Sequence, residues 1–225
     1  MAANPIYVGL DTPDADHAEA LGRAVKPYVG GLKLGLEFFM RNGPDGVRRM
    51  GRVGLPIFLD LKLHDIPNTV AGALKSLSVL DLAIVNVHAG GGLSMMQAAH
   101  AVRLPGAKLI AVTVLTSMDE GDLAGIGVFG NPAAQVQRLA ALTREAGLDG
   151  VVCSAHEVAL LKAEWANGLF VVPGIRPAGA DLGDQKRVMT PAEALSAGAG
   201  VLVIGRPITA AADPASAAAA IADTL

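Results

Sequence analysis

The sequence has one cysteine among 225 residues, Cys153, and this excludes any disulfide within the chain. A lone cysteine fits a reducing compartment, so we expect the protein in the cytoplasm. Cys153 follows two valines and is expected to be a small buried apolar side chain. The five histidines are not spaced in the pairs that zinc sites use, so no zinc site is predicted.

Long apolar runs and a basic excess are also missing. No apolar run reaches the roughly 18 residues that a membrane helix needs, and residues 1–5 lack the features of a signal peptide. The chain has 18 Lys and Arg against 21 Asp and Glu, without the clustered basic charge that nucleic-acid binding requires. Neither a membrane nor a nucleic acid is expected as a partner. The 52% of hydrophobic residues therefore predict one large core of a soluble protein.

Short apolar segments, rich in Val, Ile and Leu, alternate with segments of helical spacing along the whole chain. The apolar segments have the length of buried strands and span residues 6–11, 31–36, 57–62, 82–89, 108–115, 150–154, 169–173 and 200–206. Helical spacing is evident in residues 14–25, 70–79, 132–146 and 155–165. Alternating strands and helices predict parallel pairing with right-handed crossovers.

Helix start signals support this division. Residues 190–193 form a capping box with proline at the first helical position, and Asn131 and Asp213 each precede a proline as N-cap residues do. Eight strand–helix units predict an α/β fold, a single (β/α)8 TIM barrel domain spanning residues 1–225. An open doubly wound sheet is the alternative.

The third predicted strand breaks the apolar rule. In residues 58–63, charged and apolar side chains alternate, so Asp60 and Lys62 share one face and the leucines share the other. In a barrel strand, that charged face points inward, where ions are costly unless they are paired. Asp65 follows just beyond the strand's C-terminal end, the end at which barrel active sites lie.

The first two predicted strands carry charges at the same end. Asp11 ends the first apolar segment, and Lys33 interrupts the second. Because the C-terminal ends of neighbouring parallel strands meet on one side, these charges are expected to converge with those of the third strand. A buried ion-pair network that only fixes strand register is the structural alternative, but charges interleaved on three adjacent strands favour a functional site.

The pattern Asp60-x-Lys62-x-x-Asp65-Ile66-x-x-Thr69 resembles the signature of the orotidine 5'-phosphate decarboxylase family. The resemblance extends from residues 8–11 to residues 204–206 and is to the shorter bacterial members, which are homodimeric barrels. It implies conversion of orotidine 5'-phosphate to UMP and carbon dioxide, the last step of de novo pyrimidine synthesis. It also implies a homodimer and a reaction without metal or organic cofactor.

The resemblance implies an alternating array of Lys33, Asp60, Lys62 and Asp65, in which Asp65 reaches the site of the neighbouring subunit. Loss of carbon dioxide leaves a carbanion at C6 of the pyrimidine, and a cation held beside C6 stabilises the developing charge. Lys62 then delivers the proton as general acid. Asp60 would orient Lys62 and would itself lie near the departing carboxylate, while Lys33 would partner Asp60 and contact the ribose.

The remaining substrate contacts follow from the same resemblance. They are Asp11 and Thr69 for the ribose hydroxyls, Ile66 within the signature, Thr116 for the pyrimidine edge with Ser117 as an alternative, and Pro173, Arg176, Gln185, Gly205 and Arg206 at the phosphate end. Loops after strands seven and eight commonly form a barrel's phosphate site, and arginine gives bidentate contacts. The length of residues 173–187 predicts a lid that closes on the phosphate.

Three other functions remain open at this stage. Related barrel enzymes that act on keto-sugar phosphates share the Asp-x-Lys-x-x-Asp core, but they bind Mg²⁺ and carry a glutamate where this chain has Lys33, which would repel the cation. A Schiff-base aldolase would need Lys62 as a neutral nucleophile, whereas the flanking carboxylates favour its ammonium form. A nucleotide-binding barrel without turnover is the non-enzyme alternative.

Overall fold

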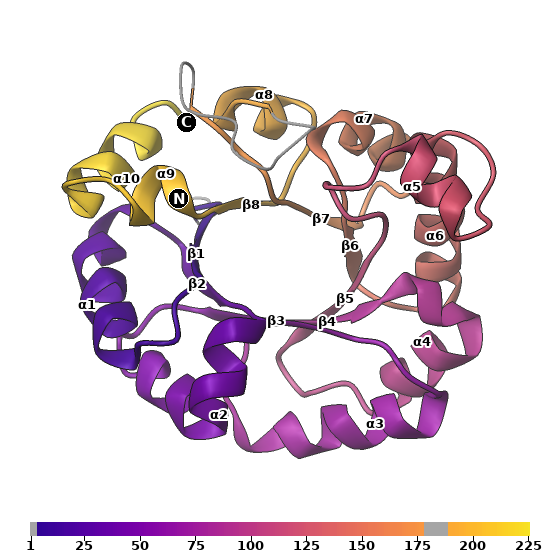
Figure 1. Cartoon of the computed structure of the whole chain (residues 1–225), viewed down its shortest axis with the longest axis horizontal. Coiled ribbons are helices and arrows are strands. Elements are labelled where there is room, and N and C mark those ends of the chain that lie inside the picture. The colour runs from indigo at the N-terminus through magenta and orange to yellow at the C-terminus, as the bar shows by residue number, and fades with distance from the viewer. Residues whose placement is uncertain (1–3, 178–188) are drawn as a thin grey trace.

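The computed structural model describes residues 4–177 and 189–225. In this part of the chain, eight parallel strands pair in sequence order, and β1 also pairs with β8, which closes the sheet into a barrel (Figure 1). The strands are β1 (Ile6–Leu10), β2 (Gly31–Leu34), β3 (Ile57–Leu63), β4 (Ile84–His88), β5 (Lys108–Val112), β6 (Gly150–Val152), β7 (Leu169–Val172) and β8 (Val201–Ile204). The predicted TIM barrel is confirmed, and the open-sheet alternative is wrong.

Helices surround the barrel, and α1 packs against α10 where the ring closes (Figure 1). They are α1 (Ala15–Val25), α2 (Leu36–Gly51), α3 (Pro67–Ser76), α4 (Gly92–Ala101), α5 (Glu120–Gly125), α6 (Pro132–Glu145), α7 (Ala155–Glu164), α8 (Pro191–Ser196), α9 (Arg206–Thr209) and α10 (Pro214–Ala222), with 3-10 turns η1 (Lys26–Tyr28), η2 (Leu77–Val79) and η3 (Ala89–Gly91). The predicted caps at Asn131, Thr190 and Asp213 are confirmed. Within the described ranges, no helix combines the length and apolarity that crossing a bilayer demands.

Several strands end earlier than the apolar segments suggest. The second ends at Leu34 rather than at residue 36, because Gly35 is the N-cap of α2 and Leu36 is its first residue. The fifth ends at Val112, because a turn closed by a hydrogen bond from the Met118 N–H to the Leu115 carbonyl follows. Helix α2 is kinked at Gly43, which leaves helical geometry at φ +58°.

Side chains of the strands alternate between two apolar regions. Leu59 and Leu61 point outward into the large core between the strands and the helices. Inside the barrel, a second cluster forms a floor, consisting of Phe58, Ile84, Ile110, Val171, Val201 and Val203. Asp60 follows Phe58 on the inward face of β3, so its carboxylate projects just above this floor, as the period-two pattern predicted.

Candidate active site

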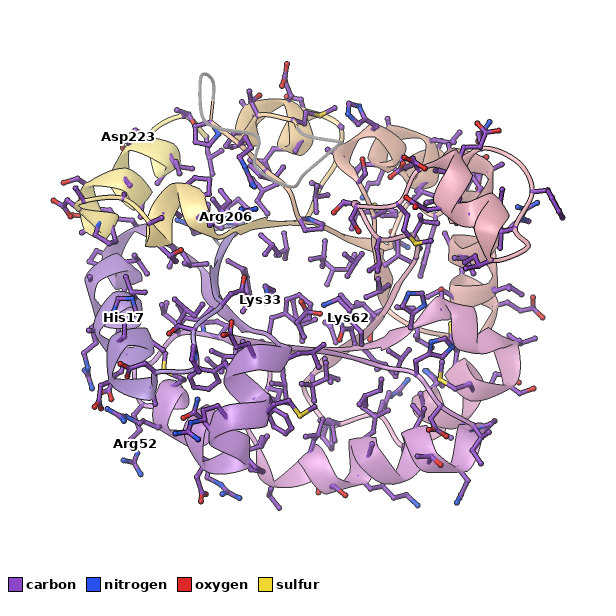
Figure 2. The ribbon with its side chains drawn as sticks, in the orientation of Figure 1. His17, Lys33, Arg52, Lys62, Arg206 and Asp223 are labelled. Atoms are coloured by element: carbon purple, nitrogen blue, oxygen red, sulfur yellow. The ribbon has the colours of Figure 1, made fainter. Side chains whose placement is uncertain are left out.

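A cavity of about 320 Å³ opens at the C-terminal ends of the strands, where active sites of barrels lie. Its volume falls within the range of small-molecule sites. Charged residues just after β1 and within β2 and β3 form one wall, and the segments after β7 and β8 form the facing wall, opposite Lys62. Figure 2 shows Lys33 and Lys62 pointing toward the barrel interior, with Arg206 across the mouth.

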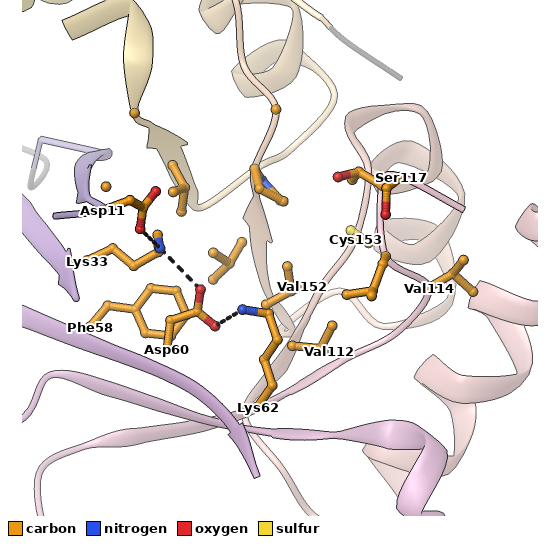
Figure 3. Close-up of a pocket in the computed structure, with 18 of the residues that line it drawn as sticks. Asp11, Lys33, Phe58, Asp60, Lys62, Val112, Val114, Ser117, Val152 and Cys153 are labelled. Carbon is orange, nitrogen blue, oxygen red and sulfur yellow. Dashed lines mark hydrogen bonds and ion pairs between the residues drawn. The ribbon is translucent and has the colours of Figure 1, made fainter. Parts of the chain in front are cut away.

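The charged wall is a continuous chain of ion pairs (Figure 3). Lys33 Nζ lies 3.1 Å from Asp11 Oδ1 and 3.3 Å from Asp60 Oδ2. The other oxygen of Asp60, Oδ1, accepts a hydrogen bond from Lys62 Nζ at 2.7 Å. Acid and base therefore alternate in the order Asp11, Lys33, Asp60, Lys62, and each inner charge is flanked by two charges of opposite sign.

Burial and pairing act in opposite directions on the two inner groups. Burial lowers the pKa of the Lys33 ammonium, but Asp60 and Asp11 outweigh it and leave that pKa above its usual value. Burial likewise raises the pKa of the Asp60 carboxyl, but Lys33, Lys62 and the hydrogen bonds to Asp60 bring that pKa below its usual value. Both groups therefore keep their charges at neutral pH despite their position in the protein interior.

Lys62 is the more accessible of the two lysines, and its backbone has an unusual conformation. Its side chain is 32% exposed, against 11% for Lys33, so its ammonium group can meet a ligand in the cavity. Lys62 is also the one non-glycine residue with positive φ in the described part of the chain, at φ +50°. Residues other than glycine rarely adopt this backbone conformation unless surrounding contacts hold it.

The facing wall is built from the segments after β7 and β8. Pro173, Gly174 and Arg176 follow β7, and Gly205 and Arg206 follow β8. Gly174 has φ +75°, which favours glycine, and the buried Arg176 donates from Nη1 to the carbonyl of Ile175. Two arginines in the lining of the cavity are suited to an anionic group at the far end from Lys62.

Comparisons with known proteins agree with this geometry. A sequence model of the orotidine 5'-phosphate decarboxylase / HUMPS family matches residues 4–221. The chain belongs to this family. An orotidine 5'-phosphate decarboxylase of Novosphingobium aromaticivorans is 60% identical over 99% of this chain and 100% of its own length. That of Sphingopyxis alaskensis is 58% identical, with 99% of each chain covered.

Solved structures show the same relationship. The crystal structure of orotidine 5'-phosphate decarboxylase from Lactobacillus acidophilus superposes with a TM-score of 0.84, at 37% identity and 98% coverage of both chains. An uncharacterized conserved protein from Geobacillus kaustophilus has a TM-score of 0.79 and 39% identity, with 96% of this chain and 98% of that chain covered. The resemblance of the signature around Asp60 to this decarboxylase family is thus confirmed.

Most residues predicted from the family signature meet in one cavity. Its lining includes Asp11, Lys33, Asp60, Lys62, Thr116, Ser117, Pro173, Arg176, Gly205 and Arg206. Asp65, Ile66 and Thr69 do not line it. Asp65 and Ile66 are exposed just before α3, and Thr69 is exposed in its first turn. Gln185 and most of the predicted lid lie outside the described residues.

The family signature did not point to Asn86, although it is fully buried beside the array. Its amide nitrogen donates to Asp60 Oδ1 at 2.7 Å, and its own oxygen accepts from the Lys62 N–H at 2.8 Å. A signal was present in the sequence, because Asn86 is a polar residue on the inward face of β4 with apolar residues on both sides of it in the chain.

Two other features of the site were not predicted. The rings of His64 and His88 stack with their centroids 5.1 Å apart, which places His64 beside the end of β4. Cys153 is buried as expected, but it also lines the cavity. Among residues 4–177 and 189–225, no three His, Cys, Asp or Glu side chains are grouped as a metal site would need.

Proposed function

We propose that this chain decarboxylates orotidine 5'-phosphate to UMP and carbon dioxide, with the array of Lys33, Asp60 and Lys62 as its reaction centre. The observation that carries the proposal is the pair of ion pairs that Asp60 makes, one to Lys33 and one to Lys62, on the wall of a cavity of nucleotide-compatible size. The names of the curated relatives, at 54–60% identity over the whole chain, support the substrate and the reaction.

In the chemical step, the bond between C6 and the carboxylate breaks, and its electron pair stays on C6. The ammonium group of Lys62 stabilises that charge as it develops, which is the kind of preorganised electrostatic term that dominates many enzymes. Lys62 then transfers a proton from Nζ to C6 to give UMP, and it regains a proton from solvent after release. No electron acceptor or donor is needed, so the step balances without a cofactor.

The remaining charges of the array position this lysine. Asp60 holds Lys62 Nζ at 2.7 Å and lies where the substrate carboxylate departs. Lys33 neutralises Asp60 from the other side and, with Asp11, faces the ribose. An anionic Asp60 beside the anionic carboxylate of the substrate would be unfavourable without both lysines, which offset the repulsion between the two carboxylates. That repulsion ends when the substrate carboxylate leaves as carbon dioxide.

Substrate orientation follows from the facing wall. Arg176 and Arg206 contact the 5'-phosphate together with Pro173, Gly205 and Gln185, and Thr116 contacts the pyrimidine edge. Both arginines line the cavity, and Figure 2 places Arg206 across its mouth from Lys62, which supports this assignment. A phosphate held at a distance from the reacting carbon supplies binding energy that the chemical step can use.

The active unit is a homodimer in which Asp65, Ile66 and Thr69 complete the partner's site. These residues are exposed and lie outside the cavity of their own chain, which supports a role at a neighbouring subunit. Asp65 then extends the alternating array beyond Lys62, and Thr69 contacts a ribose hydroxyl. The enzyme acts in the cytoplasm, without a membrane or nucleic acid as partner.

The second candidate function is that of the HUMPS branch, whose name shares the family description. Enzymes of that kind need an oxygen-rich site for Mg²⁺, with a carboxylate at the position of Lys33. Here the Lys33 ammonium lies within 3.3 Å of both Asp11 and Asp60 and occupies the space between their oxygens. A divalent cation at that place would face a like charge.

The test is the ultraviolet assay of orotidine 5'-phosphate conversion in excess EDTA. Wild-type protein should turn over the substrate, and Lys62→Ala should lose activity by about 10²–10⁴-fold or more. Lys75→Ala, on the exposed face of α3, is the matched control and should retain wild-type activity. No turnover in EDTA, combined with Mg²⁺-dependent activity on a keto-sugar phosphate, would move the chain to the second candidate function.

A further inference from the structure

The pairing of β3 with β4 is irregular at the reaction centre. Leu59 pairs with Val85, and Leu63 pairs with Val87, so three residues of β3 face the single residue Asn86 of β4. The three residues are 60–62 and include both Asp60 and Lys62. The regular ladder of backbone hydrogen bonds therefore stops where the side chains of Asp60 and Lys62 leave the sheet.

Asn86 fills this gap with its side chain. Its carbonyl oxygen accepts the backbone N–H of Lys62 at 2.8 Å, and its amide nitrogen donates to Asp60 Oδ1 at 2.7 Å. Asn86 is fully buried, and Asp60 is 7% exposed, so water does not compete for these bonds. Both groups would otherwise be polar atoms in the protein interior that need a partner.

The two bonds of Asn86 act on different properties of the array. The bond to Lys62 helps to hold a backbone at φ +50°, from which the side chain turns back toward Asp60. The bond to Asp60 fixes the plane of the carboxylate, because Oδ1 then meets both Asn86 and Lys62 while Oδ2 meets Lys33. Without the first bond, Lys62 could take more than one orientation. Without the second, the carboxylate of Asp60 could do so.

We infer that Asn86 is a positioning residue of the decarboxylase, which holds Asp60 and the Lys62 backbone so that the Lys62 ammonium stays in register with the reacting carbon. The inference rests on the proposed function. It predicts that Asn86 contributes to the chemical step without touching the substrate, since Asn86 does not line the cavity. A loss at this position should therefore appear in kcat more than in KM.

Asn86→Asp is the sharpest variant, because it is nearly isosteric and leaves the bond to the Lys62 N–H in place. The new carboxylate still accepts the Lys62 N–H, but it cannot donate to Asp60 and places a second negative charge against it. We expect kcat to fall by about 10- to 150-fold, the value of one hydrogen bond to a charged group. We also expect the acid limb of the kcat–pH profile to move to higher pH, because adjacent carboxylates resist ionisation.

Asn86→Ala removes both bonds and should lower kcat at least as far, with a smaller change in KM. The matched control is Thr143→Ala in α6, which removes a buried hydroxyl that donates to the Leu139 carbonyl at 2.7 Å, outside the cavity. It should lose stability and keep the wild-type kcat and pH profile. A residue with a purely structural role would lower the folded fraction without moving the pH profile.

Each outcome decides the inference. Folded Asn86 variants with wild-type kcat and an unshifted profile would overturn it, while an active wild type would leave the proposed function standing. If neither variant folds, as judged by circular dichroism, Asn86 serves the stability of the barrel and the inference is also overturned. An inactive wild type would instead count against the proposed function itself.

Discussion

At the scale of single residues, Lys33 and Asp60 stand out as charges that the interior would not tolerate alone. As whole residues they are 9% and 7% exposed, and removing the partner of a buried ion costs about 3–5 kcal/mol. Pairing reverses the effect of burial, so the pKa of Asp60 stays below its usual range and that of Lys33 above it. The charges of Lys33 and Asp60 therefore persist across the neutral range, and Asp60 already holds the Lys62 ammonium before substrate arrives.

The charge of Arg206 gives a first prediction at this scale. Arg206→Ala should lower kcat/KM for orotidine 5'-phosphate by about 10- to 150-fold, as expected for loss of about 1.5–3 kcal/mol from a hydrogen bond to a charged group. It should lower kcat/KM for the phosphate-free nucleoside far less, because that substrate lacks the phosphate that we propose as the partner of Arg206. Steady-state assays of both substrates measure the difference.

Arg52→Ala is the matched control for this comparison. Arg52 is an exposed arginine at the end of α2, and Figure 2 places it on the outer rim, away from Lys33 and Lys62. It should leave both substrates unchanged. Equal losses for nucleotide and nucleoside in Arg206→Ala would remove Arg206 from the phosphate site.

The pKa of His88 gives a prediction for stability against pH. Burial lowers this pKa most, and His64 and Lys62 lower it further, so the folded state favours the neutral ring. Its contribution to stability is complete above the unfolded value of 6.5 and is lost as pH falls from there through the folded pKa. Wild type should therefore lose more unfolding free energy than His88→Gln between about pH 7.5 and about pH 5.

Urea unfolding at several pH values measures this difference. His17→Gln, on the exposed face of α1, is the control and should follow the wild-type curve. If His88→Gln lost stability in parallel with wild type over the same pH range, protonation of His88 would not be linked to folding.

At the scale of elements, the capping box of α8 links a sequence signal to stability. The Thr190 hydroxyl accepts from the Glu193 N–H at 3.4 Å and donates to the Glu193 carboxylate at 2.6 Å. Thr190→Ala should destabilise the protein by about 1 kcal/mol, whereas Thr190→Ser keeps the hydroxyl and should retain most of it. The midpoint of urea unfolding at constant m-value reports both variants, and equal losses for Ala and Ser would contradict the role of the hydroxyl.

Elements were predictable where local chemistry decides them. Alternating apolar segments and N-caps identified the barrel, and charges on the inward face of β3 located its mouth. Strand ends were less predictable, since Gly35 and the turn after Val112 end strands that remain apolar beyond them. The role of Asn86 was not predicted from the sequence, because it depends on the shifted register between β3 and β4, which is a tertiary property.

At the scale of the whole molecule, one chain leaves large apolar side chains exposed next to its active site. Leu36 and Met40 of α2 are 45% and 76% exposed, and Ile66 at the start of α3 is 67% exposed. These helices follow β2 and β3, the strands that carry Lys33 and Lys62. Apolar surface of this kind is typical of an interface, and a two-fold dimer there would bring each Asp65 to the other subunit.

Subunit mixing tests this arrangement directly. Lys62→Ala and Asp65→Ala homodimers each lack one essential group at both sites, so both should be nearly inactive. In a mixed dimer, the subunit with intact Lys62 receives Asp65 from its partner and forms one complete site. Random co-expression makes half of the dimers mixed, with one of two sites working, so about one quarter of wild-type activity should return.

The control is Asp65→Ala mixed with the variant that carries both Lys62→Ala and Asp65→Ala. This mixture supplies no intact Asp65 and should stay inactive. Activity no higher than the mean of the two single variants would mean that Asp65 does not act across a subunit interface.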